Sequence, residues 1–176
     1  MIHGVRFAAG GQDMHRIWPG FLLLILAMPA VRATDVVNIK LMTLDLAVDI
    51  AQGAIDACRK DGYQISVVVV DRSGRSQVLM RDVFANQYMT QLAQAKANAV
   101  VLSNTSSSAL RKNRADIAAE LNLLDDLLVL DGGLPVTVAG SMIGAVGVSG
   151  APGGDLDEAC AQRGIDGVQE RLDFAD

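Results

Sequence analysis

Residues 132–154 read GGLPVTVAGSMIGAVGVSGAPGG and continue into DLDEAC at residues 155–160. Val136 and Val138 flank a threonine, Ala139-Gly140 turns the chain, and apolar residues alternate again in the returning segment. This pattern predicts an antiparallel β-hairpin followed by a glycine-rich exit loop. A helix is predicted to begin at Asp155, with Glu158 completing a capping box.

Two glycines, Gly144 and Gly147, interrupt the returning strand where a side chain would normally add packing. A glycine inside a strand is typical of a bulge, or of a surface that another backbone or a ligand approaches closely. We favour the close packing of a helix on the sheet over a ligand contact.

Upstream, one helix and a second hairpin are predicted. Apolar residues recur at helical spacing between an N-cap at Thr43 and a stop at Asp61-Gly62. The β-branched run 65–70 predicts a central strand, and the turn at 71–74 leads into a second strand over 76–81.

The middle of the chain predicts helices over about 85–102 and 114–124, separated by a polar loop at 103–108. Residues 127–130 predict a further strand. The last helix should bury the stripe formed by Cys160, Gly164, Val168 and Leu172. Together these elements predict one α+β domain, with an approximately five-stranded, mostly antiparallel sheet flanked by helices.

The N-terminus predicts a cleavable signal peptide over residues 1–33. An apolar core at 20–28 follows His15 and Arg16, and Val31-Arg32-Ala33 places small residues where a signal peptidase reads them. The apolar run is short for a membrane span, so we expect cleavage between Ala33 and Thr34, a periplasmic or secreted protein and no stable membrane insertion afterwards.

The predicted mature domain, residues 34–176, is acidic and contains no histidine. Its 12 Lys and Arg against 19 Asp and Glu give a formal charge of −7, which disfavours nucleic acid and anionic lipid as partners. Both histidines, His3 and His15, lie in the leader. A Ser-His-Asp or Cys-His catalytic arrangement, a His-rich zinc site and a proximal histidine for haem are therefore excluded from the domain.

The only cysteines, Cys58 and Cys160, do not form a Cys-x-x-Cys pair, which argues against redox-motif and structural zinc sites. An oxidising compartment would allow a disulfide between them. We favour the alternative of two buried thiols on separate helices, since unpaired cysteine is often buried.

The loop Gly150-Ala151-Pro152-Gly153-Gly154 precedes a helix, as phosphate-binding loops do. Its spacing is not G-x-G-x-x-G, and acidic residues follow it at once, which argues against a nucleotide site. Asp155, Asp157 and Glu158 could instead hold a divalent cation, but helix capping and dipole complementation account for them better.

Several separated motifs resemble the GlcG/HbpS-like family of small haem-binding, sometimes haem-degrading, bacterial proteins. They are GGLPV at 132–136, IGAVGVSG at 143–150, DEAC at 157–160, VVVDRSG at 68–74 and AQAKA at 93–97. The likeness spans about residues 41–172 and implies a profilin-like arrangement. It also implies haem as a cofactor and assembly into homo-oligomers.

The resemblance directs attention to Arg81 and Lys96, which occupy family motif positions and could bind a haem propionate or another carboxylate. The alternative is an exposed strand-end arginine and a lysine whose ammonium reaches solvent past an apolar stem. Tyr88, Met89 and Met80 could ligate or pack against haem. Gly132 and Gly133, which open the matching GGLPV segment, complete the candidate ligand-binding set.

The leading hypothesis is an exported soluble homo-oligomer that binds haem or a similar tetrapyrrole, with slow haem degradation as a further activity. Any such degradation would depend mainly on the iron. Two alternatives stay open. One is a catalytic or accessory protein that binds a small organic acid through Arg81 and Lys96, and the other is a structural oligomer without a ligand.

Overall fold

The computed structural model describes residue 35 and residues 37–175. The predicted leader, with its cleavage position at Ala33 and Thr34, lies outside the described residues. The compact unit that begins at Asn38 is described below.

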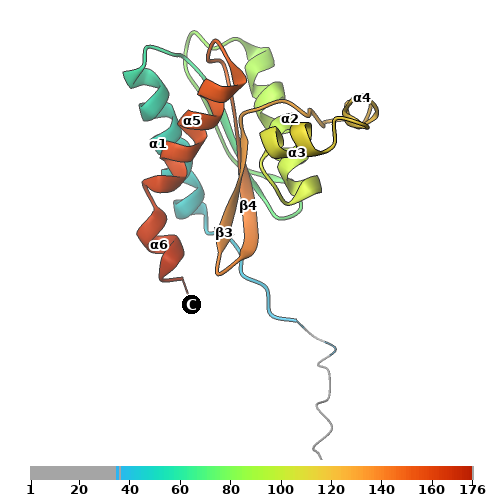
Figure 1. Cartoon of the computed structure of the whole chain (residues 1–176). Coiled ribbons are helices and arrows are strands. Elements are labelled where there is room, and N and C mark those ends of the chain that lie inside the picture. Colours follow the sequence, from blue (N-terminus) through green and yellow to red (C-terminus); the bar gives the residue numbers. More distant parts are fainter. Residues whose placement is uncertain (1–34, 36, 176) are drawn as a thin grey trace, which may run out of the picture. The chain divides into compact units, whose positions relative to one another are not determined.

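Four antiparallel strands form one sheet in the order β2-β1-β4-β3 (Figure 1). They are β1 (Ser66–Asp71), β2 (Ser76–Arg81), β3 (Gly133–Val138) and β4 (Ser141–Ser149). The two predicted hairpins are confirmed, since β1 pairs with β2 and β3 pairs with β4. β1 and β4 pair in the centre, in a register that places Val68 opposite Gly147.

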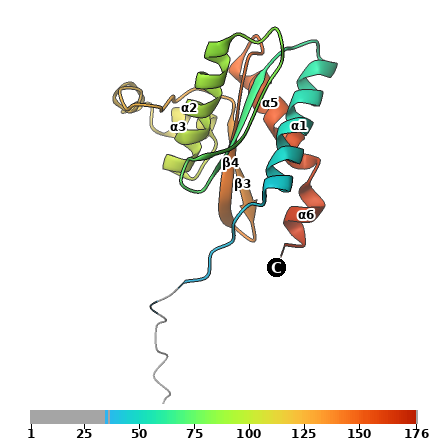
Figure 2. The same cartoon turned by 180° about the vertical axis from the view of Figure 1, so that it is seen from behind.

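Helices cover both faces of this sheet (Figures 1 and 2). One face carries α1 (Leu44–Lys60) and α5 (Gly154–Asp166), which α6 (Gln169–Asp173) follows in the chain. The other carries α2 (Gln87–Ser103), with α3 (Ser107–Asn113) packed beside it.

Alternating side chains of β1 serve two separate cores. Val67 and Val69 join the cluster under α1 and α5, while Val68 and Val70 join the smaller cluster under α2. Because both faces of β1 are buried, its sequence is a continuous run of valines and not an alternation of apolar and polar residues. The predicted single α+β domain is confirmed, with four strands rather than five.

The fifth predicted strand, residues 127–130, is wrong. Leu128 donates its backbone N–H to the carbonyl of Ala95 on α2, 3.1 Å away, so this segment runs beside the helix and does not extend the sheet. Val129 is buried and Leu127 is partly buried against Ala99 of α2 and Leu110 of α3. A short apolar run that is buried in this way cannot be told from a strand by its sequence.

Of the helix predicted at 114–124, only one turn is helical, and a separate helix begins within the predicted polar loop. Within the predicted loop, Ser106 caps α3 by accepting the N–H of Ala109 on its hydroxyl at 3.1 Å. The chain then forms only a single further turn, α4 (Ala118–Leu121). The serine run is thus a helix start, which is a common role for serine.

Gly147 allows α2 to lie directly on β4, as the sequence predicted. A Cβ atom at this position would lie 2.9 Å from the backbone nitrogen of Ala97 and would also collide with the carbonyl of Ala93. At Gly133 on β3, a Cβ would lie 2.6 Å from the carbonyl of Lys96. Two glycines therefore set how closely α2 approaches the sheet.

A disulfide joins α1 to α5 on the opposite face. Cys58 and Cys160 are bonded, with their Cα atoms 5.5 Å apart, so the favoured expectation of two separate thiols is wrong. The two helices cross at Gly53 and Gly164, where an added Cβ on Gly53 would lie 3.1 Å from the Gly164 Cα. This close crossing brings the cysteines together, although 102 residues separate them.

No helix among the described residues is long and apolar enough to cross a bilayer.

Replacing Gly147 by Ala should destabilise the fold by about 1–3 kcal/mol, because the added methyl must displace the α2 backbone. Gly167→Ala is the matched control, since its Cβ would meet nothing closer than 3.5 Å and its φ is −63°. Denaturant unfolding of both variants gives the comparison. Equal stability of the two variants would contradict this account of Gly147.

Replacing Cys58 and Cys160 together by Ala should lower the free energy of unfolding by about 2–5 kcal/mol, because the unfolded chain gains the freedom of a loop of about 100 residues. Urea unfolding with and without dithiothreitol measures this. The reductant should weaken the wild type and leave the double variant unchanged. If full reduction of the disulfide leaves the free energy of unfolding of the wild type unchanged, the expected stabilisation by the disulfide is wrong.

Candidate functional site

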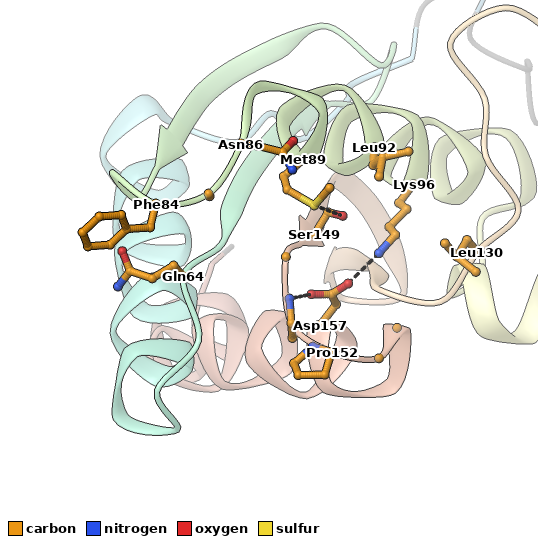
Figure 3. A pocket seen from close by; sticks show the side chains of 15 residues that line it. Gln64, Phe84, Asn86, Met89, Leu92, Lys96, Leu130, Ser149, Pro152 and Asp157 are labelled. Atoms are coloured by element: carbon orange, nitrogen blue, oxygen red, sulfur yellow. Dashed lines mark hydrogen bonds and ion pairs between the residues drawn. The ribbon is translucent and has the colours of Figure 1, made fainter.

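A cavity of about 490 Å³ opens where β4 ends and α2 and α5 begin (Figure 3). Its walls come from the first turns of α2, the loop after β2 and the glycine-rich loop before α5. The lining residues are Gln64, Phe84, Ala85, Asn86, Met89, Leu92, Lys96, Leu130, Ser149, Gly150, Ala151, Pro152, Gly153, Gly154 and Asp157.

A buried ion pair closes one side of this cavity. The Lys96 Nζ donates to Asp157 Oδ2 at 2.7 Å and to the carbonyl of Val148 at 2.9 Å. Only 1% of the Lys96 side chain and 4% of the Asp157 side chain are exposed. The pair thus joins α2 to α5 at the end of β4.

Asp157 also holds the glycine-rich loop. Its Oδ1 accepts the backbone N–H of Ala151 at 2.9 Å. Burial raises the pKa of the Asp157 carboxyl above its ordinary value, and the Lys96 ammonium acts in the opposite direction. Both carboxylate oxygens are therefore committed to partners within the protein.

The predicted capping box at the start of α5 is wrong. The helix has Gly153 as its N-cap, with no side-chain cap. Glu158 instead accepts a hydrogen bond from the Ser108 hydroxyl at 2.8 Å. Of the carboxylates attributed to capping and dipole complementation, Asp157 thus has a buried role that the sequence interpretation missed.

The loop that forms the rim, residues 82–86, is held from two sides. Asp82 is buried and accepts from the Arg59 guanidinium on α1 at 2.6 Å and from the backbone N–H of Ile65 at 3.3 Å. Arg81 donates to the carbonyl of Ala85. Arg81 therefore braces the rim from outside the cavity, and the structure does not bring it beside Lys96.

Met89 faces the cavity from the first turn of α2. Figure 3 shows its side chain directed toward Ser149, whose hydroxyl donates to the Met89 sulfur at 3.5 Å. Ser149, the last residue of β4, is 3% exposed. A thioether is a weak acceptor, so this contact orients the sulfur more than it stabilises the fold.

Of the candidate residues, Met89 and Lys96 line the cavity. Tyr88 is 60% exposed and is not part of the lining. Gly132 and Gly133 pack behind Lys96, where a Cβ on Gly132 would lie 2.9 Å from Nζ. The alternative of a Lys96 ammonium that reaches solvent is excluded by its burial.

Sequence reasoning missed Ser149 and assigned Asp157 to a helix cap. The sequence does contain a weak indication of a buried acidic partner, since Lys96 lies within an apolar helical stripe and a buried lysine requires a counter-charge. Nothing in the spacing of residues 96 and 157 indicated that they would meet.

Metal ligation by protein side chains alone has no support in the described part of the chain. Among those residues, no group of three or more His, Cys, Asp or Glu side chains is placed to hold a metal ion.

Comparison with known proteins identifies relatives of this fold. A sequence model for the family described as haem degrading protein HbpS-like matches residues 42–166. A crystal structure of HbpS is 38% identical, with a TM-score of 0.71, and the match covers 78% of this chain and 96% of that one. A double mutant of Streptomyces reticuli HbpS is 36% identical, with a TM-score of 0.70, over 80% of this chain and 95% of that one.

A more distant structure is that of a PduOC:heme complex. It is 22% identical, with a TM-score of 0.65, and the match covers 73% of this chain and 95% of that one. At this identity the likeness concerns the fold alone. None of the curated proteins compared with the chain matches it.

Replacing Asp157 by Ala should lower the free energy of unfolding by about 3–5 kcal/mol, because the Lys96 ammonium then lies buried without a counter-charge. Asp49→Ala is the matched control, since its ion pair with Arg171 is half exposed and should contribute about 1 kcal/mol or less. Denaturant unfolding distinguishes the two. If both variants lose a similarly small amount of the free energy of unfolding, the structural role assigned to the buried pair is wrong.

Proposed function

The chain belongs to the HbpS-like haem-degrading protein family, and on that premise we propose that it binds haem or a similar tetrapyrrole in the cavity of Figure 3. The observation that carries the proposal is a cavity of about 490 Å³ in which apolar side chains of α2 face a polar, glycine-rich loop next to the buried Lys96–Asp157 pair. This volume is typical of small-molecule and cofactor sites.

The residues present suit a flat, partly anionic ligand. Met89 and Leu92 line the cavity from α2, and Leu130 adds apolar surface beside them. Lys96 uses two of its three N–H donors on Asp157 and Val148. The pair is almost completely buried, so it gives the cavity a charge-balanced polar wall and not a free cation.

The fold itself is compatible with haem, since the PduOC structure of similar fold is a haem complex. Bound haem would supply iron redox chemistry, and the protein would supply binding, orientation and exclusion of water. The family description names haem degradation. Loss of haem absorbance on incubation with ascorbate and oxygen would extend the proposal to degradation.

The organic-acid alternative loses its main support. It required Arg81 and Lys96 to grip one carboxylate, but Arg81 is engaged with the rim loop and Lys96 is paired with Asp157. The same two residues were expected to bind a haem propionate, so haem is retained as the proposed ligand on the family match and not on these contacts.

Export is part of the proposal. The apolar leader with Val31-Arg32-Ala33 supports secretion through a membrane. The Cys58–Cys160 disulfide is consistent with an oxidising compartment.

Self-association is supported by apolar side chains that gather at one edge. Leu79, Val83, Phe84 and Tyr88 are each more than half exposed, and they follow one another from β2 to the start of α2. Exposed apolar surface of this kind often marks an interface. A second copy of the chain is the partner we propose, in keeping with the prevalence of homo-oligomers.

Wild-type protein should change the absorbance spectrum of haemin, and Leu92→Trp should weaken haemin binding by about tenfold or more, an effect of about 1.4 kcal/mol or more. The larger ring fills the cavity from the α2 wall. The matched control is Leu102→Trp, on the same helix but beside a separate cavity of about 390 Å³. A haemin spectrum that the wild type leaves unchanged would contradict haem binding. Equal haemin binding by Leu92→Trp and Leu102→Trp would show that haemin does not bind in the cavity of Figure 3.

Secreted protein should begin at Thr34 or within a few residues of it, because the small residues at 31 and 33 direct cleavage. Intact mass spectrometry of exported material checks this. Exported protein that retains residues 1–33 would show that the predicted cleavage after Ala33 is wrong.

Phe84→Ser should reduce the mass of the assembly in solution, because it removes an apolar side chain that is 84% exposed. Phe174→Ser, at a side chain 83% exposed near the C-terminus, is the control and should leave the mass unchanged. Light scattering at micromolar concentration gives the result. A wild type that is monomeric there would remove the oligomer proposal.

A further inference from the structure

The cavity contains few side chains that could coordinate iron. Its lining has no histidine, cysteine or tyrosine, which leaves Met89, Lys96, Ser149, Asp157 and the side-chain amides of Gln64 and Asn86. The Asn86 amide oxygen accepts the backbone N–H of Tyr88, and amide oxygens suit hard cations such as Mg²⁺ and Ca²⁺. Asp157 has both oxygens committed, and Lys96 donates to Asp157. Ser149 is buried at the end of β4, and its hydroxyl donates to Met89. Among these lining residues, Met89 alone offers a soft donor atom without a charged partner.

We propose that the Met89 sulfur is the iron ligand that this cavity provides, with the Ser149 hydroxyl as its orienting partner. This inference rests on the proposed haem binding and names the atom that would hold the iron. Thioether sulfur is an established axial ligand of haem iron in proteins. A sulfur that accepts one hydrogen bond retains a second lone pair for a metal.

The backbone fixes Met89 in this position. Asn86 is the N-cap of α2, and Met89 donates its N–H to the Asn86 carbonyl at 3.1 Å. Met89, Leu92 and Lys96 follow at intervals of three and four residues, so they project from the same face of the helix. Figure 3 shows Met89 and Lys96 directed at the cavity, with the sulfur toward Ser149, and Leu92 also lines it.

The structure also separates Met89 from the other two candidates raised by the sequence. Met80, on β2, packs against the core under α1 and α5, on the opposite face of the sheet. Tyr88 is mostly exposed and outside the lining. Adjacent positions 88 and 89 therefore have different environments because successive helical residues point about 100° apart.

The test compares wild type, Met89→Leu and Met80→Leu, each loaded with haemin and, separately, with metal-free protoporphyrin. Leucine conserves volume and should preserve the fold. Met89→Leu should lose the near-infrared sulfur-to-iron charge-transfer band and shift the reduction potential downward, since a methionine ligand raises it. Its haemin affinity should fall about tenfold, or about 1.4 kcal/mol, while protoporphyrin affinity stays within about twofold of wild type. Met80→Leu should match the wild type in all four measurements.

A second variant tests the same geometry in the opposite direction. Met89→His places imidazole, the commonest haem ligand, at this position and should bind haemin more tightly than wild type, with a histidine-type spectrum. The assignment is overturned if Met89→Leu keeps the wild-type band and potential, or if it weakens haemin and protoporphyrin equally. Failure of the wild type to bind either porphyrin would instead overturn the proposed function, and the ligand assignment with it.

Discussion

The buried pair of Lys96 and Asp157 is the interaction on which the site depends. It joins α2 on one face of the sheet to α5 on the other, through the open end of β4. A charge at this depth is strongly unfavourable without its partner, so each side chain requires the other in place. The same carboxylate holds Ala151, and the pair therefore positions the glycine-rich loop as well as the two helices.

Close backbone approach makes this pair possible. Gly147 and Gly133 let α2 rest on β4 and β3, and Gly132 leaves room for the Lys96 ammonium beside Val148. On the other face, the Gly53–Gly164 crossing and the disulfide draw α1 and α5 together. Glycines in this fold thus act chiefly by leaving space, since a single methyl group at these positions would push whole elements apart.

The pair also gives the cavity its chemical character. Because Asp157 balances Lys96, the buried pair adds little net charge to the cavity wall. The Met89 sulfur and the apolar side chain of Leu92 on α2 lie in the same cavity lining as this pair. The lining combines apolar side chains with polar groups and backbone, so it suits a ligand that has both an apolar surface and polar edges better than a highly charged acid, which would need uncompensated cations.

Local pattern was enough to predict both hairpins, α1 and α2, because alternation and helical spacing are properties of neighbouring residues. It also predicted the tight packing at Gly147, since a glycine inside a strand often marks a place where another backbone approaches closely. The strand predicted at 127–130 is wrong because a segment buried against a helix has the same short apolar run as a segment buried in a sheet.

The roles of Asp157, Ser149 and Arg81, and the Cys58–Cys160 bond, depend on elements that meet only after the chain has folded. The sequence by itself therefore determined the hairpins, the helices α1 and α2 and their apolar faces, and the tertiary structure decided which polar groups meet. Periodicity records which side of an element is buried, whereas the partner of a buried charge is set by the three-dimensional path of the whole chain.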